Sequence, residues 1–220
     1  NTTDGNNFTG CFINNSALKD GGAFYIGDTG GNGKNITLTD CKFINNTADY
    51  AGGAISNQMS DSHFINSTFI GNKAVFGGSV IMKDAVTVNN EIIGCTFINS
   101  VAIDDLKSDI QVRGKGGAIF ARDNKISVYD STFINCTALE GGAIYWNGGM
   151  NYKNTNPSSL HDTKYLGING LVSNSEFLNN TAVRGGAVYW QATNGTIKDS
   201  KFTGNNATEG GALYWEGGVE

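Results

Sequence analysis

One two-part phrase recurs seven times along the chain, and it restricts the folds that the chain can adopt. A Phe-x-x-Asn-like tetrad comes first, and a Gly-Gly-Ala-like triplet with an apolar and aromatic run follows it. The tetrads begin at Phe12, Phe43, Phe69, Phe97, Phe133, Phe177 and Phe202, and the glycine pairs begin at Gly21, Gly52, Gly77, Gly116, Gly141, Gly185 and Gly210. Both parts are spaced by 25 residues between the last two copies. A period of this length indicates an architecture in which each unit stacks on its neighbours.

The repeated unit has the composition of short strands. It reads Gly-Gly-Ala-Ile-Tyr-Trp at 141–146, with close copies at 185–190 and 210–215. β-Branched and aromatic runs bounded by Gly and Asn favour strands, and no run sustains a helical period. A unit of this length holds three strands and three corners, which is one rung of a parallel β-helix with rungs about 4.8 Å apart. We therefore expect an all-β solenoid of about seven rungs over residues 1–220, with loop insertions at about 101–115 and 147–170.

Stacking of equivalent positions accounts for the unusual composition. The residue after each Gly-Gly-Ala-like triplet is apolar, so this row should face the core, where each buried side chain contributes about 1.5–3 kcal/mol. Fourteen of the 31 Gly residues belong to the corner pairs, which supply positive φ and close backbone approach. The single Pro fits strands that are hydrogen-bonded on both sides. The Asn residues that end the tetrads are expected to tolerate left-handed turns and to stack their amides along the column.

Composition excludes several other classes of protein. The chain is 39% hydrophobic, which is too much for a disordered chain, and its Gly residues lack the three-residue period of collagen. A net charge of −5 without a basic cluster gives no basis for binding nucleic acid. No apolar run is long enough to span a membrane. Because the chain begins with Asn1 and shows no signal-peptide pattern, we expect it to be a segment of a longer or processed protein.

The repeat pair resembles that of a known family of surface proteins. Gly-Gly-Ala-Ile together with Phe-x-x-Asn is similar to the repeats of the chlamydial polymorphic membrane proteins, and the fuller phrases at 41–48 and 141–146 resemble the adhesin-like proteins of methanogenic archaea. The resemblance extends from Phe12 to Trp215. It implies a secreted or surface-displayed, right-handed parallel β-helix that serves in attachment or in envelope structure.

The four cysteines permit a disulfide framework in a secreted chain. Cys41 and Cys95 occupy the same position of the repeat but lie two rungs apart, at about 9–10 Å, which is too far for a bond. Cys136 takes an Asn position and has no cysteine beside it. Cys11 and Cys41, on adjacent rungs at near-equivalent positions, form the one plausible pair. The other thiols are expected to be free and buried.

Sequons for N-glycosylation are frequent in this Asn- and Thr-rich chain. Some lie inside the repeat, where the Asn side chain serves the turn, and the exposed ones are candidates for glycans. The sequons begin at Asn1, Asn7, Asn14, Asn35, Asn45, Asn66, Asn135, Asn179, Asn194 and Asn206.

The two insertions are the natural places for a chemical site, because loops on a rigid scaffold often carry function. The first contains Asp104, Asp105, Asp109 and Arg113, and the second contains Tyr152, Pro157, His161, Asp162 and Tyr165. Polysaccharide-cleaving enzymes of this fold draw their acids from neighbouring rungs, whereas these residues lie in local loops, so we expect solvated loops and no catalytic residues. His63 and His161 have no Cys or His residues clustered with them that could complete a metal site. The stretch 28–33 is similar to the start of a calcium-binding loop, but the twelfth position of that loop, which needs an acid, is Thr39. No metal site and no cofactor is expected.

Aromatic pairs in the last three copies are the strongest candidate for a binding surface. The pairs are Tyr145-Trp146, Tyr189-Trp190 and Tyr214-Trp215. Successive rungs should stack them into two ladders, with the Tyr row facing outward and the Trp row facing inward or round a corner. The ladders either stiffen the column or form a flat aromatic strip on which glycan rings or a partner protein dock.

These features favour a non-catalytic, adhesin-like protein at the cell surface. Its partners would be surface glycans or proteins of another cell, with no nucleic acid and no membrane-spanning part in this segment. One alternative is a structural subunit whose uncapped ends stack head-to-tail into an extracellular filament. A second alternative is a polysaccharide lyase or hydrolase built on the same fold.

Overall fold

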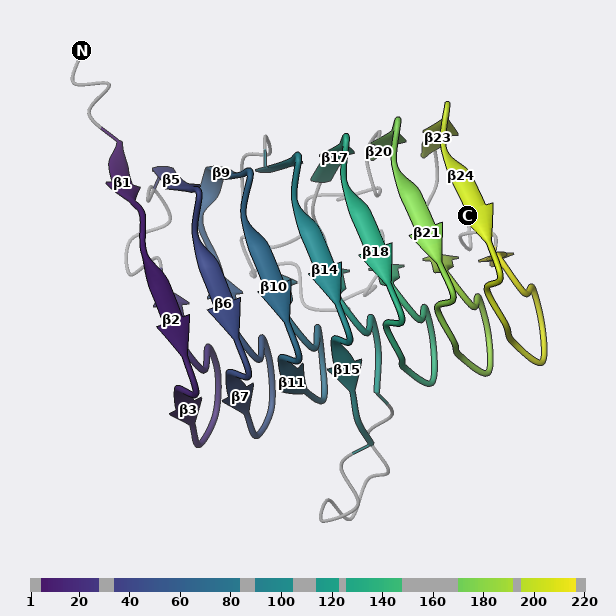
Figure 1. Ribbon diagram of the computed structural model, residues 1–220, viewed down its shortest axis with the longest axis horizontal. Helices are drawn as coiled ribbons and strands as arrows, with labels where there is room; N and C mark the ends of the chain where they lie inside the picture. The colour runs from purple at the N-terminus through teal and green to yellow at the C-terminus, as the bar shows by residue number, and fades with distance from the viewer. Residues whose placement is uncertain are drawn as a thin grey trace, which may run out of the picture.

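A computed structural model describes residues 5–27, 34–83, 90–104, 114–122, 126–147, 170–191 and 195–216. Within these ranges the regular structure consists of 25 short strands in four parallel sheets. In each of the first four turns the chain visits the four sheets in the same order and returns to the first sheet one rung further along (Figure 1). In the last three turns, isolated bridges at Thr137, Thr181 and Asn206 take the place of the strand of sheet 3. Strands of sheet 2 run down the near side and the chain returns behind them while it advances toward the C-terminus, which makes a right-handed coil (Figure 1). The expected parallel β-helix is confirmed.

Sheets 1 and 2 each contain seven strands. Sheet 1 consists of β1 (Asn6–Phe8), β5 (Lys34–Thr39), β9 (Ser60–Ile65), β13 (Asn90–Ile93), β17 (Ile126–Tyr129), β20 (Leu171–Ser173) and β23 (Thr196–Lys198). Sheet 2 consists of β2 (Cys11–Ile13), β6 (Lys42–Ile44), β10 (Thr68–Ile70), β14 (Thr96–Ile98), β18 (Thr132–Ile134), β21 (Glu176–Leu178) and β24 (Lys201–Thr203).

Sheet 3 is short, and sheet 4 carries the Gly-Gly-Ala runs. Sheet 3 consists of β3 (Ser16–Ala17), β7 (Thr47–Ala48), β11 (Lys73–Ala74) and β15 (Val101–Ala102). Sheet 4 consists of β4 (Phe24–Ile26), β8 (Ile55–Asn57), β12 (Val80–Met82), β16 (Ile119–Arg122), β19 (Ile144–Asn147), β22 (Val188–Gln191) and β25 (Leu213–Trp215). Between sheets 3 and 4, isolated parallel bridges join one residue of each rung, and we call this line the bridge row: Asp20, Ala51, Phe76, Lys115, Glu140, Arg184 and Glu209.

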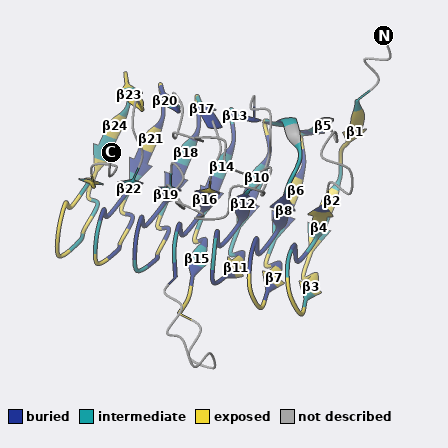
Figure 2. Ribbon diagram, turned by 180° about the vertical axis from the view of Figure 1, so that it is seen from behind, coloured by how far each residue is buried: buried dark blue, intermediate teal, exposed yellow. Residues whose placement is uncertain are grey.

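The core is a set of ladders in strict register. The seven Phe residues of sheet 2 pair with one another from rung to rung. Their ring centroids are 4.6–4.9 Å apart and their planes differ by 3–13°. The five inner Phe side chains are fully buried, and Figure 2 shows the buried strands in the middle of the column with exposed ones at its ends. The expected rung spacing of about 4.8 Å is therefore confirmed by the stacked rings.

The glycine pairs make the corner before sheet 4. The first glycine of each pair has a φ between 61° and 68°, a region that favours glycine. At the second position a side chain has no room, because a Cβ on Gly53 would lie 2.0 Å from the carbonyl oxygen of Gly78 in the next rung. Both roles expected for the glycine pairs are confirmed.

The Asn residues that end the tetrads form an amide ladder inside the column. Asn46 donates from its backbone N–H to Asn72 Oδ1 at 2.9 Å and from Nδ2 to the Phe12 carbonyl at 2.9 Å. The expected left-handed geometry belongs to the residue before each of these positions, for example Asn45 at φ 53°. That part of the prediction was placed one residue too late, because the ladder Asn must point inward while the corner residue points to solvent.

The described residues include no helix with the length and apolarity that crossing a bilayer demands.

Candidate functional site

The outer face of sheet 4 carries the aromatic residues that the sequence singled out. The middle residue of each strand faces away from the main core, and we call this line the outer row: Tyr25, Ser56, Ile81, Phe120, Tyr145, Tyr189 and Tyr214. The Trp row faces inward, with the rings of Trp146 and Trp190 stacked at 4.5 Å in the main core. The predicted pair of ladders and the alternation of Tyr and Trp are confirmed.

The Tyr side chains do not form an exposed strip, because the bridge row packs over them. The side chains of Tyr145 and Tyr189 are only 1% and 2% exposed, and they belong to a second, smaller core cluster. Trp146 and Trp190 are buried in the main core. The expectation of a flat docking strip is wrong for these four residues. In the last rung Tyr214 is half-buried and Trp215 is 67% exposed.

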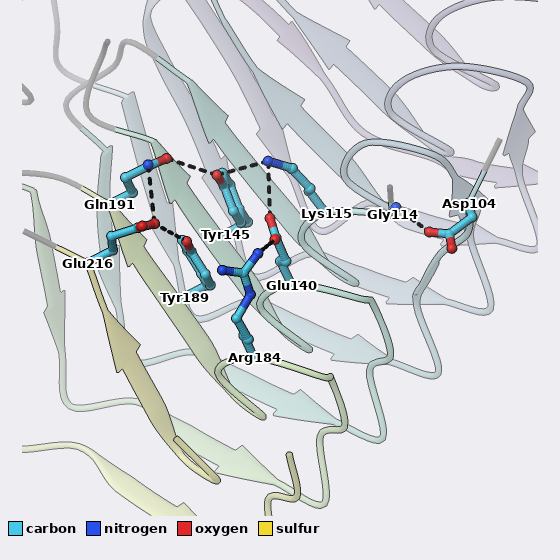
Figure 3. A network of polar contacts seen from close by, with 9 residues as sticks. All are labelled: Asp104, Gly114, Lys115, Glu140, Tyr145, Arg184, Tyr189, Gln191 and Glu216. Atoms are coloured by element: carbon cyan, nitrogen blue, oxygen red, sulfur yellow. Dashed lines mark hydrogen bonds and ion pairs between the residues drawn. The ribbon is translucent and has the colours of Figure 1, made fainter. Parts of the chain in front are cut away.

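A network of charges and hydroxyls covers the Tyr ladder (Figure 3). The Lys115 ammonium lies 3.0 Å from Glu140 Oε2, and Arg184 pairs with the other oxygen of Glu140. Lys115 also donates to the Tyr145 hydroxyl at 3.0 Å, and that hydroxyl donates to Gln191 Oε1 at 3.0 Å. The carboxylate of Glu216 accepts from Gln191 and from the Tyr189 hydroxyl. These residues come from the fourth to the seventh rung, so the network ties four rungs together.

Cations also lie over the aromatic rings of this ladder. The Lys115 ammonium lies 4.5 Å from the centroid of the Tyr145 ring. The Arg184 guanidinium lies 5.4 Å and 5.6 Å from the ring centroids of Tyr189 and Tyr214. Within about 6 Å such contacts are attractive. Lys115, Glu140, Arg184 and Glu209 therefore alternate in charge along the bridge row, and its two cations cover the rings beneath.

Burial governs the protonation of the network. Desolvation alone would lower the pKa of the Lys115 ammonium, but the Tyr145 hydroxyl and the Glu140 carboxylate outweigh it and the pKa is raised. Desolvation raises the pKa of Tyr145, and Lys115 offsets part of that change. The pKa of Tyr189 is raised by burial and by its hydrogen bond to Glu216. The lysine therefore stays charged and the tyrosines stay neutral at physiological pH, and the network is held together by paired groups.

The insertions contribute one described acid. At the base of the first insertion, Asp104 Oδ1 accepts a hydrogen bond from the Gly114 backbone N–H at 2.7 Å. The other candidates in the insertions lie outside the described residues: Asp105, Asp109, Arg113, Tyr152, Pro157, His161, Asp162 and Tyr165. His63 lies on sheet 1, where its Nδ1 is 3.0 Å from Glu91 Oε2. Across the described parts of the chain, no three His, Cys, Asp or Glu side chains gather as metal ligands would.

Most of the described sequons are exposed, and five of them lie at corners of the column. Seven are exposed, namely Asn7, Asn14, Asn45, Asn66, Asn135, Asn179 and Asn206. Five of these have a φ between 48° and 57°, namely Asn14, Asn45, Asn66, Asn135 and Asn179. Asn35 lies in β5, and Asn1 and Asn194 lie outside the described residues. The Asn residues with positive φ therefore have a role in the backbone as well as a side chain that reaches solvent.

The four cysteines are all free thiols. The predicted Cys11–Cys41 disulfide is wrong, because Cys11 pairs in register with Lys42 and is therefore shifted by one position from Cys41. Successive strand residues point to opposite faces, so Cys11 is exposed and Cys41 is buried. Burial raises the pKa of Cys95 and Cys136 to about 12. Cys95 Sγ lies 3.3 Å from the carbonyl oxygen of Phe64, in the preceding rung.

Comparison with known proteins gives one family match. The Chlamydia polymorphic membrane protein repeat matches residues 9–27 and 40–58, which are parts of the first two rungs. No curated protein and no solved structure matches the chain. The first two rungs thus contain repeats of this kind, and the ladders continue their register through five further rungs.

Removing the shared carboxylate should weaken the network over the Tyr ladder. The side chain of Glu140 is 5% exposed and pairs with two cations, so Glu140→Gln leaves both without their partner. Lys115 keeps its hydrogen bond to Tyr145, so the change tests the loss of the shared negative charge. We expect a loss of about 1–3 kcal/mol in the free energy of unfolding, measured by urea titration. Glu209→Gln, at an exposed position of the same row, is the matched control and should change stability by less than about 0.5 kcal/mol. Equal effects of the two substitutions would contradict the assigned role.

The buried thiols should make the fold less stable in alkali. An unfolded thiol ionises near pH 8.5, whereas Cys95 and Cys136 keep their protons until about pH 12 in the folded chain. Their contribution is therefore complete below pH 8.5 and is lost as the pH rises, by on the order of 1 kcal/mol per thiol and pH unit. Urea titrations between pH 7.5 and 10.5 should show a shallower decline for Cys95→Ser/Cys136→Ser than for the unchanged chain.

The same cysteines can be counted by their reactivity. A thiol reagent should modify one cysteine, Cys11, in the folded protein and four after unfolding, because the other three are buried. Parallel pH profiles for the two proteins, or rapid modification of all four thiols in the folded state, would contradict the burial that we assign.

Proposed function

We propose that this chain is a non-catalytic, adhesin-like segment of a surface protein, which mediates attachment or forms part of the envelope. The observation that carries the proposal is the match of its first two rungs to the repeat of the Chlamydia polymorphic membrane proteins. The resemblance of residues 41–48 and 141–146 to the adhesin-like proteins of methanogenic archaea supports the same role and an extracellular location.

The physical properties of the column suit attachment. Its interior is filled by side-chain ladders that pack against one another, so we expect the column to rearrange little when it binds a partner. Its outer faces present the same residue type at intervals of one rung, as in sheet 2, where half-buried Thr68, Thr96 and Thr132 form one line and Ile70, Ile98 and Ile134 form another. Solenoids use such extended faces to bind partners. The proposal assigns no catalysis to this scaffold.

Attachment can be measured with beads that carry the folded protein. We expect these beads to adhere to at least one surface of a panel of epithelial cells, microbial cells and immobilised glycans, and excess soluble protein should compete. Beads with a similarly acidic globular protein are the control. Absence of adhesion across the panel would contradict the proposal. The glycans from the same incubation are then analysed for length, and shortened chains would support the polysaccharide lyase or hydrolase instead.

One observation favours the filament as a second candidate function. In the last rung Leu213 and Trp215 are 44% and 67% exposed, although their counterparts in the preceding rungs are buried. Another rung stacked on this surface would bury them, and a second copy of the chain could supply it. Electron microscopy of the purified protein should then show filaments that Trp215→Lys shortens. Discrete particles at all concentrations would exclude this function and leave attachment standing.

Glycosylation at the exposed sequons would fit an extracellular location. Asn14, Asn45, Asn135 and Asn179 are exposed at the corner after sheet 2. Intact mass before and after enzymatic deglycosylation of the protein from its native source measures this, and an unmodified mass would contradict it.

A further inference from the structure

The cover of sheet 4 is interrupted at the second rung. In the outer row, Ser56 stands between Tyr25 and Ile81. In the bridge row, Ala51 stands between Asp20 and Phe76. Both rows thus have a small side chain in the same rung, whereas the fourth to seventh rungs carry large aromatic or charged groups in both. In those rungs the large side chains of the two rows pack together, whereas the small side chains of the second rung need cover from side chains of neighbouring rungs.

The packing of the two rows places Asp20 at this interruption. Elsewhere a bridge-row side chain contacts the outer-row ring of its own rung or of the next one. The recorded contacts are Phe76 with Phe120 at 5.3 Å, Lys115 with Tyr145 at 4.5 Å, and Arg184 with Tyr189 at 5.4 Å and Tyr214 at 5.6 Å. By the same relation, we infer that Asp20 of the first rung faces the outer-row positions of its own and the next rung, Tyr25 and Ser56.

Asp20 and Ser56 each hold a buried oxygen without a partner. Within the described ranges, Asp20 Oδ1 and Ser56 Oγ are the two buried side-chain oxygens that make no hydrogen bond. The Asp20 side chain is 7% exposed, and its other oxygen lies 3.5 Å from the Lys83 ammonium. A buried acceptor that gives up water without a replacement costs about 1–3 kcal/mol. Two such groups in adjacent rungs point to a partner that the protein itself does not supply.

Lys83 forms a movable cover over this place. It follows β12 in the third rung, yet its ammonium pairs with Asp20 in the first rung. Its side chain therefore crosses the second rung, above the small residues Ala51 and Ser56. The side chain is 15% exposed and its contact with the carboxylate is long for an ion pair. A change of the Lys83 rotamer would break this contact and open the space above the second rung without moving the backbone.

An exposed aromatic ring lies next to the two oxygens. Tyr25 pairs directly with Ser56 across adjacent strands and is 56% exposed. The site thus combines an aromatic face, a carboxylate and a hydroxyl, with an ammonium at its edge. An aromatic face packs against the C–H groups of a sugar ring, while carboxylate and hydroxyl oxygens bind the hydroxyl groups of the sugar.

We propose that Tyr25, Asp20, Ser56 and Lys83 form a saccharide-binding subsite. A sugar ring lies on Tyr25, one of its hydroxyls donates to Asp20 Oδ1, and the same or a neighbouring hydroxyl bonds to Ser56 Oγ. The displaced Lys83 ammonium donates to a further sugar oxygen. This inference deepens the proposed attachment function by giving it a ligand class, and it rests on that function for its biological meaning only.

Saturation-transfer NMR with methyl glycosides of glucose, galactose, N-acetylglucosamine and galacturonic acid tests the subsite. At least one glycoside should receive saturation from the folded protein, and titration then gives its dissociation constant. Tyr25→Ser and Asp20→Ala should each weaken binding about tenfold or more, which corresponds to about 1.4 kcal/mol. Ser56→Ala, which removes one unpaired oxygen and changes little volume, should weaken binding at least threefold while the melting temperature stays equal or rises.

Trp215→Ser is the matched control, because it removes an exposed aromatic ring at the other end of sheet 4 and should leave the dissociation constant unchanged. The subsite is overturned if no glycoside receives saturation, or if Tyr25→Ser and Ser56→Ala bind as well as the unchanged chain. A crystal structure that retains one water on Asp20 Oδ1 and Ser56 Oγ in the presence of a bound glycoside would also overturn it. If the subsite is overturned but the protein-coated beads still adhere, attachment does not depend on this site.

Discussion

Register between parallel strands is the constraint on which the rest of this structure depends. Each rung places every residue directly over its equivalent in the rung before, and the stacked Phe rings show that interval to be 4.6–4.9 Å. At that spacing a side chain has one principal neighbour, namely another copy of its own position. Residues that pair well with themselves are therefore favoured, such as Phe with Phe in offset stacks and Asn with Asn through amide hydrogen bonds. Glycine is favoured where the neighbour is a backbone carbonyl, as at Gly53.

The same constraint explains why the outer face of sheet 4 needs charge of both signs. A like charge repeated at one rung of separation would repel itself along the whole column. The bridge row avoids this by alternation, so that Glu140 is shared by Lys115 and Arg184. The tyrosines below are then covered by cations that are themselves neutralised, and a second small core forms outside the main one. Stability at this face comes from a continuous line of unlike neighbours, whereas the interior depends on identical ones.

Most of the interior could be predicted from the sequence, and most of the outer face could not. Repetition reveals ladders directly, so the Phe row, the glycine corners and the Trp row followed from counting, while the structure shows that the Trp row faces inward. The cover over Tyr145 and Tyr189 depends on which residue precedes each glycine pair, and that position varies from Asp20 to Ala51 to Phe76 along the chain. Cys11 shows the other limit. A shift of one residue relative to Cys41 changes its face from core to solvent, and only the pairing of Cys11 with Lys42 shows that shift.

A column built on self-pairing has few places where a foreign molecule can bind, because its polar groups are already satisfied by the next rung. Large partners can bind along the regular outer faces, but a site with unpaired polar groups for a small ligand is expected where the repetition fails. The second rung is such a place, since Ser56 and Ala51 interrupt two rows at once and the side chain of Lys83 has to reach across from the third rung. The unpaired oxygens of Asp20 and Ser56 are the energetic cost of that interruption. The persistence of this cost in a chain that satisfies its ladders elsewhere is the physical reason to assign the irregular rung, rather than the regular aromatic ladder, to recognition.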